Sequence, residues 1–171
     1  MFFTFHVMIK AVTGNNIFQK YKNRVYILKN ICYNVKKVEE CRKMMKKCRV
    51  TITTVVDGQE NSIAREGEME LSTASATLIY REENAATRIC LDHEKAEIER
   101  IGDYTMHLHL ISGQLTDGEI GLGGSSGGIQ SFTHRIQYSA TEQSLLLSLR
   151  YDLMISGEVQ KMQIRLMARY L

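Results

Sequence analysis

The sequence of 171 residues contains no proline and no tryptophan, and its apolar runs are short. A membrane-spanning helix needs roughly 20 consecutive, mainly apolar residues, and no run approaches that length. The four cysteines include no Cys-x-x-Cys pair, so the sequence predicts free thiols in a reducing cytoplasm and not a disulfide framework. With 44% hydrophobic and 24% charged residues, the chain fits one globular domain.

Motifs for catalysis and for nucleotide binding are missing as well. No Gly-x-Ser-x-Gly occurs, and no cysteine has a plausible histidine partner, so nothing supports nucleophilic catalysis. The stretch Gly118–Gln130 holds six of the chain's twelve glycines, but Ile129 and Gln130 stand where a P-loop needs Lys and Ser or Thr. Ser126 replaces the third glycine of a dinucleotide fingerprint. We predict no cofactor and interpret the stretch as a flexible connection.

Charge is distributed unevenly along the chain. Residues 1–43 carry nine Lys and Arg against two Asp and Glu, a net +7, whereas residues 44–171 carry thirteen against seventeen, a net −4. A basic arm suits nucleic acid or an anionic membrane. The arm is nevertheless dominated by residues of AT-rich codons, because Phe, Ile, Lys, Asn, Tyr and Met fill 25 of its 43 positions. We therefore predict no nucleic-acid partner and no membrane partner.

Residues 1–43 also lack the organisation of a targeting peptide. No basic residue precedes the first apolar run, and neither a helical nor an alternating period persists. Codons for residues 38–40 can form a purine-rich ribosome-binding sequence a short distance upstream of Met44-Met45. We interpret residues 1–43 as a poorly structured extension translated from upstream sequence, with the domain at residues 44–171. The alternative is a basic docking arm.

After Arg49 the hydrophobic pattern has a period of two, which is typical of strands with one buried and one wet face. The clearest apolar faces are Tyr104, Met106, Leu108 and Leu110, the alternate residues from Leu145 to Ile155, and those from Met162 to Tyr170. Turn signals stand between the runs at Asp57-Gly58, Glu82-Glu83-Asn84, Gly102-Asp103, Ser112-Gly113, Asp117-Gly118 and Ser156-Gly157. The pattern predicts an all-β antiparallel barrel of roughly 8–10 strands in meander order, because closure removes exposed edges. The glycine-rich connection then lies at one rim of the barrel.

Three segments, "TLIYREE", "AEIERIGDYTMHLHLISGQ" and "LSLRYDLMISGEVQKMQIRL", resemble the YwiB-like family of small bacterial proteins. The resemblance covers about residues 46–171. It implies a calycin-like barrel, similar in outline to lipocalins and fatty-acid-binding proteins, in a domain of unknown function. The chain departs from the family at "GLGGSSGG", where the family tends to show a Thr-x-Tyr-Gly type of start to the following strand. The resemblance implies a fold and brings no established ligand or reaction.

Strand parity also predicts a polar cluster inside the barrel. If the apolar residues face inward, then Tyr80, Glu82, Arg100, Tyr151 and His134 face inward with them. A buried charge needs a partner, and Glu82 supplies one for Arg100. One interpretation is a structural ion pair supported by tyrosine hydroxyls. The other is an anchor for the carboxylate or phosphate of an otherwise apolar ligand, a task that the guanidinium fork suits.

His107 and His109 have the spacing of two metal ligands on one strand, but parity places both on the outer face. We therefore predict no metal site. Three hypotheses for function remain: a non-catalytic binder of a small, partly apolar molecule or peptide in or at the mouth of the barrel, an enzyme that uses Glu82, His134 or Arg100, and a structural or protein-interaction module with a filled core. The sequence leaves the oligomeric state open, a homodimer included.

Overall fold

A computed structural model describes residues 45–171, and the predictions for residues 1–43, Cys32 and Cys41 lie outside the described residues. The strands are β1 (Lys46–Val56), β2 (Gln59–Leu71), β3 (Ser75–Glu82), β4 (Ala85–Asp92), β5 (Lys95–Ile101), β6 (Tyr104–Ile111), β7 (Leu115–Leu122), β8 (Ser125–Ala140), β9 (Ser144–Ile155) and β10 (Glu158–Tyr170). Each strand pairs with its neighbour in sequence, and β1 pairs with β10 to close an antiparallel barrel. The predicted all-β barrel and its meander order are confirmed. Within these residues no helix has the length and hydropathy that a membrane crossing requires.

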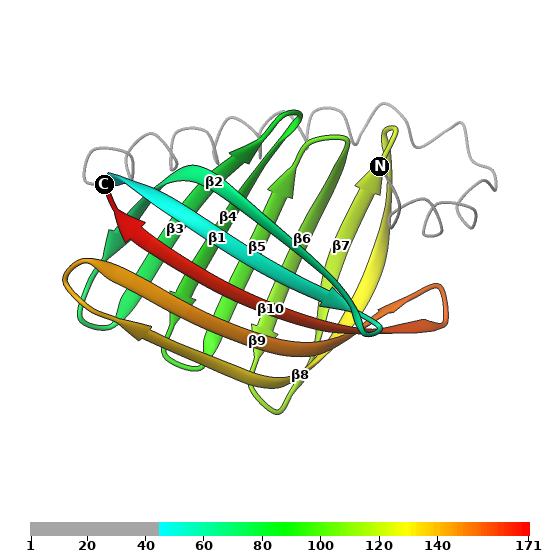
Figure 1. Cartoon of the computed structure of the whole chain (residues 1–171). Helices are drawn as coiled ribbons and strands as arrows, with labels where there is room; N and C mark the ends of the chain where they lie inside the picture. Colours follow the sequence, from blue (N-terminus) through cyan, green and yellow to red (C-terminus); the bar gives the residue numbers. More distant parts are fainter. Residues whose placement is uncertain (1–44) are drawn as a thin grey trace. The chain divides into compact units, whose positions relative to one another are not determined.

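The barrel is flattened into two layers whose strands cross at a steep angle (Figure 1). One layer contains β3 to β7, and the other contains β1, β10, β9 and β8. Two long strands, β2 and β8, turn the corners between the layers. β2 pairs with β1 from Gln59 to Met69 and with β3 only from Gly67 to Leu71. In the same way, β8 pairs first with β7 and then with β9. The interior lies between the layers.

Two-residue turns connect several of the strands. Asp57-Gly58 and Gly123-Gly124 have positive φ at both residues, the backbone of the type I′ hairpin turn, whose twist matches that of the flanking strands. The glycine-rich stretch is therefore mostly strand, with its turn confined to Gly123-Gly124. The turn predicted at Asp117-Gly118 is wrong, because Gly118 lies inside β7, where a Cβ would come within 2.6 Å of the His107 carbonyl oxygen.

Inward-facing side chains form rows that run across the strands. The central row is apolar and buried: Met69, Leu78, Ile89, Ile98, Leu108 and Ile129. On one side of it lies a row of Tyr80, Thr87, Arg100, Met106, Ile120 and Gly127, in which the first two are buried and the other four are half-buried. Beyond it stand Glu82, Tyr104 and Leu122 at the rim. We name this the open end of the barrel.

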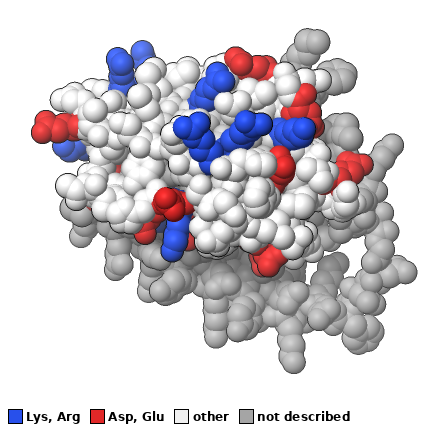
Figure 2. All heavy atoms as spheres, turned by 90° about the horizontal axis from the view of Figure 1, so that it is seen from below, with Lys and Arg blue, Asp and Glu red and all other residues white. Residues whose placement is uncertain are grey.

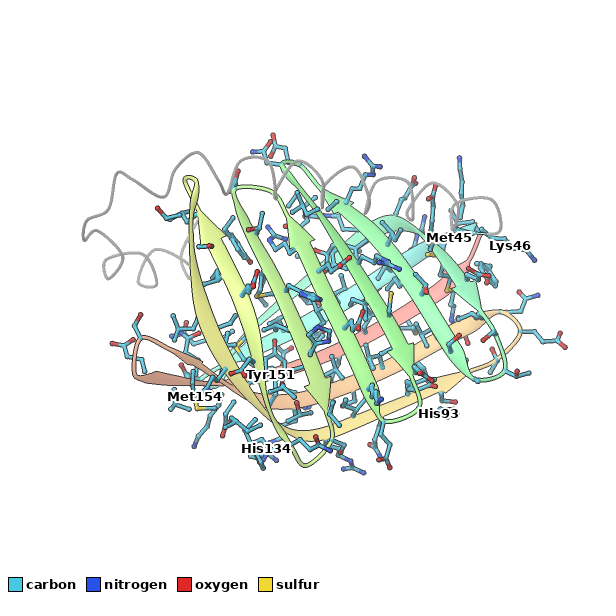
Figure 3. All side chains as sticks on the ribbon, turned by 180° about the vertical axis from the view of Figure 1, so that it is seen from behind. Met45, Lys46, His93, His134, Tyr151 and Met154 are labelled. Carbon is cyan, nitrogen blue, oxygen red and sulfur yellow. The ribbon has the colours of Figure 1, made fainter. Side chains whose placement is uncertain are left out.

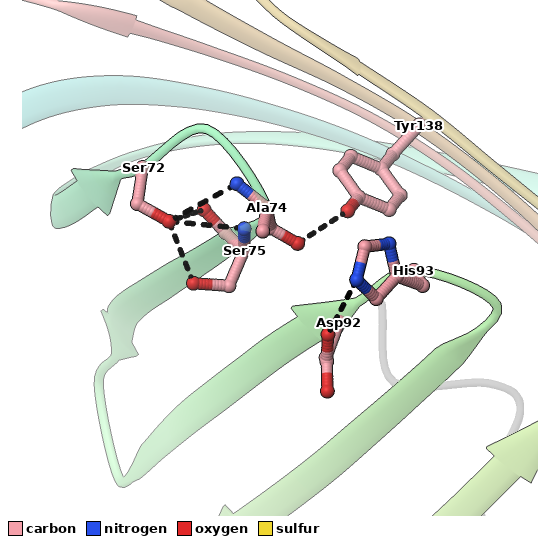
Figure 4. A network of polar contacts seen from close by, with 6 residues as sticks. All are labelled: Ser72, Ala74, Ser75, Asp92, His93 and Tyr138. Atoms are coloured by element: carbon pink, nitrogen blue, oxygen red, sulfur yellow. Dashed lines mark hydrogen bonds and ion pairs between the residues drawn. The ribbon is translucent and has the colours of Figure 1, made fainter.

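The opposite end, which we name the closed end, is apolar and covered. Ala76, Leu91, Ala96 and Leu110 face inward there and are buried. Tyr138 of β8 reaches across to the turn between β2 and β3, where its hydroxyl donates to the Ala74 carbonyl oxygen at 3.0 Å (Figure 4). The Ser72 hydroxyl organises that turn by accepting from the Ser75 amide at 3.0 Å. Side-chain and backbone contacts thus join the two layers at the closed end.

Candidate functional site

The open end contains the ion pair that the sequence predicts. A terminal nitrogen of Arg100, on β5, donates to Oε2 of Glu82 at the end of β3, at 3.1 Å. The Arg100 side chain is 15% exposed and the Glu82 side chain 28% exposed. The charges are therefore partly desolvated, and the pair is neutral as a whole. Nε of Arg100 is buried and has no hydrogen-bond partner among the described residues.

Aromatic and hydroxyl side chains surround the guanidinium. Its carbon lies 4.8 Å from the centre of the Tyr104 ring, which is cation–π distance. Tyr80 and Thr87 stand side by side with Arg100 in the β3–β4–β5 register. Burial raises the pKa of Tyr80, and a hydrogen bond with Thr87 opposes that rise in part. Burial likewise raises the pKa of Tyr104, so both phenols stay protonated and keep a proton to donate at neutral pH.

Tyr151 comes to the same region from β9, in the other layer (Figure 3). Its side chain is buried, and burial raises its pKa above the ordinary tyrosine value, with Tyr104 and Tyr80 adding to the rise. Thr133 lies opposite Tyr151 in the β8–β9 register, and its buried hydroxyl has no partner among the described residues. Polar groups of both layers thus meet in the interior.

His134 does not belong to this cluster, and its predicted inward orientation is wrong. The β8–β9 register shifts between Thr133 and Arg135, which makes His134 the extra residue of a β-bulge. The bulge reverses parity: Ser131 and Thr133 are buried before it, whereas Ile136 and Tyr138 take the inner positions after it. His134 is exposed on the outer face, with Nε2 3.0 Å from a carboxylate oxygen of Asp152 (Figure 3).

The remaining wall of the open end is apolar and ends at a glycine. Met106 and Ile120 are half-buried and continue the row of Arg100 across β6 and β7. Gly127 ends that row on β8, and a Cβ at this position would meet no atom within 4 Å. The open end is therefore amphipathic, with a charged and phenolic side on β3–β5, an apolar side on β6–β7 and free space at Gly127.

His107 and His109 lie on the outer side of β6, as predicted, with their ring centres 4.4 Å apart. Nδ1 of His109 lies 3.4 Å from a carboxylate oxygen of Glu97. Within residues 45–171, His, Cys, Asp and Glu side chains form no group of three or more that could hold a metal ion.

Sequence reasoning did not include four polar residues of the interior among its candidates: Thr87, Tyr104, Ser131 and Thr133. Tyr104 was already assigned to an inward face, so its place beside Arg100 followed from pairing β5 with β6. Parity along Ala85–Asp92 would have found Thr87 in the same way. Ser131 and Thr133 gave no such signal, because the apolar residues Ile136 and Tyr138, which follow the bulge, have the opposite parity.

Comparisons with known proteins agree with this architecture. Residues 47–166 match the model of a family described as "Domain of unknown function (DUF1934)". The crystal structure of the YwiB protein from Bacillus subtilis is similar to this chain with a TM-score of 0.65 and 16% sequence identity, over 76% of this chain and 97% of that one. At this identity the likeness shows the fold alone. No curated protein matches. The predicted resemblance is confirmed: the chain belongs to the DUF1934 family and contains a YwiB-like β-barrel domain of unknown function.

Proposed function

We propose that the barrel is a non-catalytic binder of a small, partly apolar molecule or peptide, which enters at the open end. The observation that supports the proposal is that the hydrogen-bond donors of Arg100 are only partly satisfied. Glu82 takes one terminal nitrogen, while the buried Nε has no acceptor among the described residues. A buried donor without a partner costs free energy, and a carboxylate or phosphate oxygen of a ligand would remove that cost.

The surroundings of Arg100 support a ligand with two different ends. Phenolic hydroxyls and the guanidinium suit a polar end, whereas Met106 and Ile120 suit an apolar one. Gly127 leaves space next to this wall. We also expect the protein to occupy a reducing compartment such as the cytoplasm, since Cys48 and Cys90 are free thiols.

The enzyme hypothesis is weakened because the histidine that it used does not face the interior. That hypothesis drew on Glu82, His134 and Arg100, and His134 lies on the outer face beside Asp152. The groups that remain are a paired carboxylate, a paired guanidinium and protonated tyrosines. This set is better suited to holding a ligand than to transferring its protons.

A titration with 1-anilinonaphthalene-8-sulfonate, an apolar fluorophore with one anionic group, tests the proposal. We expect saturable binding to the full chain with enhanced fluorescence. Arg100→Gln should weaken binding about tenfold or more, because it removes a charge-assisted hydrogen bond. The control Arg81→Gln, on the exposed side of β3, should change affinity less than about twofold. Native mass spectrometry of the purified protein should reveal a co-purifying small molecule.

Gly127→Leu keeps the proposal testable if Arg100→Gln fails to fold. This change leaves the ion pair intact and fills the space at the open end, so it should abolish binding of the fluorophore. Saturable binding that neither variant weakens would place the fluorophore elsewhere. A complete lack of binding, with no co-purifying molecule, would favour the module with a filled core.

A further inference from the structure

A second surface lies on the outside of the barrel, across β1, β10, β9 and β8. It contains an open groove of about 550 Å³. The groove is lined by Thr51, Thr53, Gln137, Tyr138, Ser139, Leu146, Leu147, Ser148, Arg165, Leu166 and Met167. Its lining comes from four neighbouring strands of one layer, so the groove is a property of the sheet face and not of a loop.

Arginines gather on this face. Arg135 of β8, Arg150 of β9, and Arg165 and Arg169 of β10 are all exposed there. Arg49 of β1 lies directly opposite Arg169. Figure 2, which views the barrel from below, shows several Lys and Arg side chains in the upper middle of the visible face, with Asp and Glu side chains beside them. We name the groove and these five arginines the basic groove face.

The arrangement of these arginines costs stability. Arg135 lies directly opposite Arg150, and Arg49 opposite Arg169, and like charges in facing positions of antiparallel strands repel each other. The ion pairs within the described residues involve other groups. Arg165 has a neutral neighbour, the Gln163 amide oxygen at 3.1 Å from its Nε. Within residues 45–171 none of the five arginines forms an ion pair, although Glu66 lies opposite Arg49 in the β1–β2 register.

A general excess of positive charge does not explain the face. Residues 44–171 carry thirteen Lys and Arg against seventeen Asp and Glu, a net −4. Acidic side chains follow the outer side of β2, next to β1, at Glu60, Glu66, Glu68 and Glu70, and Glu66 lies opposite Arg49. Five of the thirteen Lys and Arg of residues 44–171 lie on the basic groove face, and the acidic strand β2 borders that face at Arg49.

Apolar side chains occupy the middle of the basic groove face. Leu146 is 51% exposed and Met167 is 38% exposed, and the two lie opposite each other in the β9–β10 register. The Arg135–Arg150 pair lies toward one end of these strands and the Arg49–Arg169 pair toward the other. Arg150 lies six positions along β9 from Ser144, which faces Arg169, so the two arginine pairs are roughly 20 Å apart at the rise of an extended chain.

We propose that the basic groove face docks an extended acidic segment of another protein. The segment carries carboxylates that meet the two arginine pairs, roughly six residues apart, and an apolar side chain that covers Leu146 and Met167. Protein interfaces combine an apolar centre with a polar rim, and arginine is enriched in them. The facing arginines would be neutralised by the partner, which accounts for an arrangement that is unfavourable in the free barrel.

An acidic peptide fits the face better than a nucleic acid does. Single-stranded nucleic acid is held by exposed aromatic rings on which bases stack. The centre of the groove instead presents Leu146 and Met167. Tyr138, the aromatic residue of the lining, is half-buried, and its hydroxyl is engaged by Ala74.

Fluorescence anisotropy of a labelled synthetic peptide tests the proposal on the full chain. The probe is a peptide of about nine residues, the length that spans both arginine pairs, in which Glu alternates with Thr around a central Leu. A peptide with Gln in place of Glu and a single-stranded oligo(dT) are compared with it, at low and at physiological salt. We expect saturable binding of the Glu peptide, weakened by salt, and much weaker binding of the other two probes.

Two double variants with the same change in net charge distinguish binding to this face from attraction by the overall electrostatic field of the protein. Arg150→Glu/Arg165→Glu should weaken binding of the Glu peptide about tenfold or more, because it reverses the charge in one arginine pair and at Arg165 in the lining of the groove. Arg81→Glu/Lys95→Glu, on exposed positions of β3 and β5, should weaken it less than about twofold. Leu146→Ser keeps every charge and should weaken the peptide about threefold, since it removes part of the apolar centre.

Three outcomes would overturn the proposal. Equal weakening by both double variants would show that net charge alone attracts the peptide. Tighter binding of oligo(dT), lost in Arg150→Glu/Arg165→Glu, would make the face a nucleic-acid surface. Absence of saturable binding at millimolar peptide would show that the face does not dock an acidic segment. Unchanged circular dichroism of each variant confirms that folding is not the cause.

Discussion

The open and closed ends of the barrel are built by the same strands from different side chains. Along β3, inward positions run from Ala76 at the closed end to Glu82 at the open end. Along β6, which runs in the opposite direction, they run from Tyr104 at the open end to Leu110 at the closed end. Strands that run in opposite directions must reverse their order of polar and apolar residues to produce this result, and β3 and β6 do so.

The different side chains of the two ends suit them to different roles, stability at the closed end and binding at the open end. The closed end is buried and is tied across the layers by Tyr138, so it provides the packing that stabilises the fold. The open end contains a partly exposed charged pair and three tyrosines, of which Tyr80 and Tyr151 are buried and Tyr104 is half-buried. Polar groups there reduce the gain from burial, a cost that is common where a site serves binding and not stability.

The largest expected effect compares one apolar side chain from each region. Leu78 is 1% exposed in the central row, so Leu78→Ala should lower the free energy of unfolding by about 3 kcal/mol, through lost burial and a residual cavity. Met106, half-buried at the open end, should lose only about 1 kcal/mol on Met106→Ala, because solvent can relax into the space. Urea unfolding measures both. Equal losses would show that the open end is packed as tightly as the core.

The next effect concerns the ion pair. Arg100→Met should cost about 2–3 kcal/mol, between the values for exposed and for buried pairs, because Glu82 keeps some contact with water. Arg100→Met/Glu82→Gln should recover more than half of that loss. Arg81→Met, at an exposed position, serves as the control and should lie within about 0.5 kcal/mol of wild type.

A double-mutant cycle by urea unfolding gives the coupling between Arg100 and Glu82. Additive effects of the two single changes would mean that the pair at 3.1 Å contributes nothing, and that Arg100 stabilises the barrel through its contact with Tyr104 instead.

The alternation of residues was sufficient to predict most of the open end. Strand parity placed Arg100, Glu82, Tyr80 and Tyr151 on the inner face, and the structure brings Arg100 and Glu82 into contact. Parity works here because a side chain can leave its face only if the register slips or a residue is inserted. Where neither happens, the side of the sheet that a side chain faces follows from its position in the alternation along the strand.

Two features could not be predicted by counting. His134 is the inserted residue of the bulge in β8, and a strand with one extra residue still alternates on each side of it. Gly118 looked like a turn residue after Asp117, but it allows β7 to approach the His107 carbonyl. In both cases the deciding contact comes from a neighbouring strand, which local sequence does not specify.

A smaller effect is expected from alkaline pH. Burial raises the pKa of Tyr151 in the folded barrel above the ordinary value of 10.0, so its neutral form contributes stability that is complete below about pH 10 and is lost as pH rises toward the folded pKa. One pH unit above 10, the loss is about 1.4 kcal/mol. The decrease in unfolding free energy between about pH 9 and pH 11 should therefore be about 1 kcal/mol smaller in Tyr151→Phe. An equal decrease in both proteins would place the phenol in contact with water.

The smallest expected effect tests the closed end. Tyr138→Phe removes the hydrogen bond to the Ala74 carbonyl, at 3.0 Å, while keeping the ring, so the unfolding free energy should fall by only about 0.5–1 kcal/mol. Hydrogen exchange is the sharper measurement, because the Ser72 amide, bonded to the Ser75 carbonyl, should exchange faster once the turn is released from β8. Ser72→Ala loosens the turn from within and is the matched comparison. If Tyr138→Phe leaves exchange at this turn unchanged while Ser72→Ala accelerates it, then Tyr138 covers the closed end without tying its two layers together.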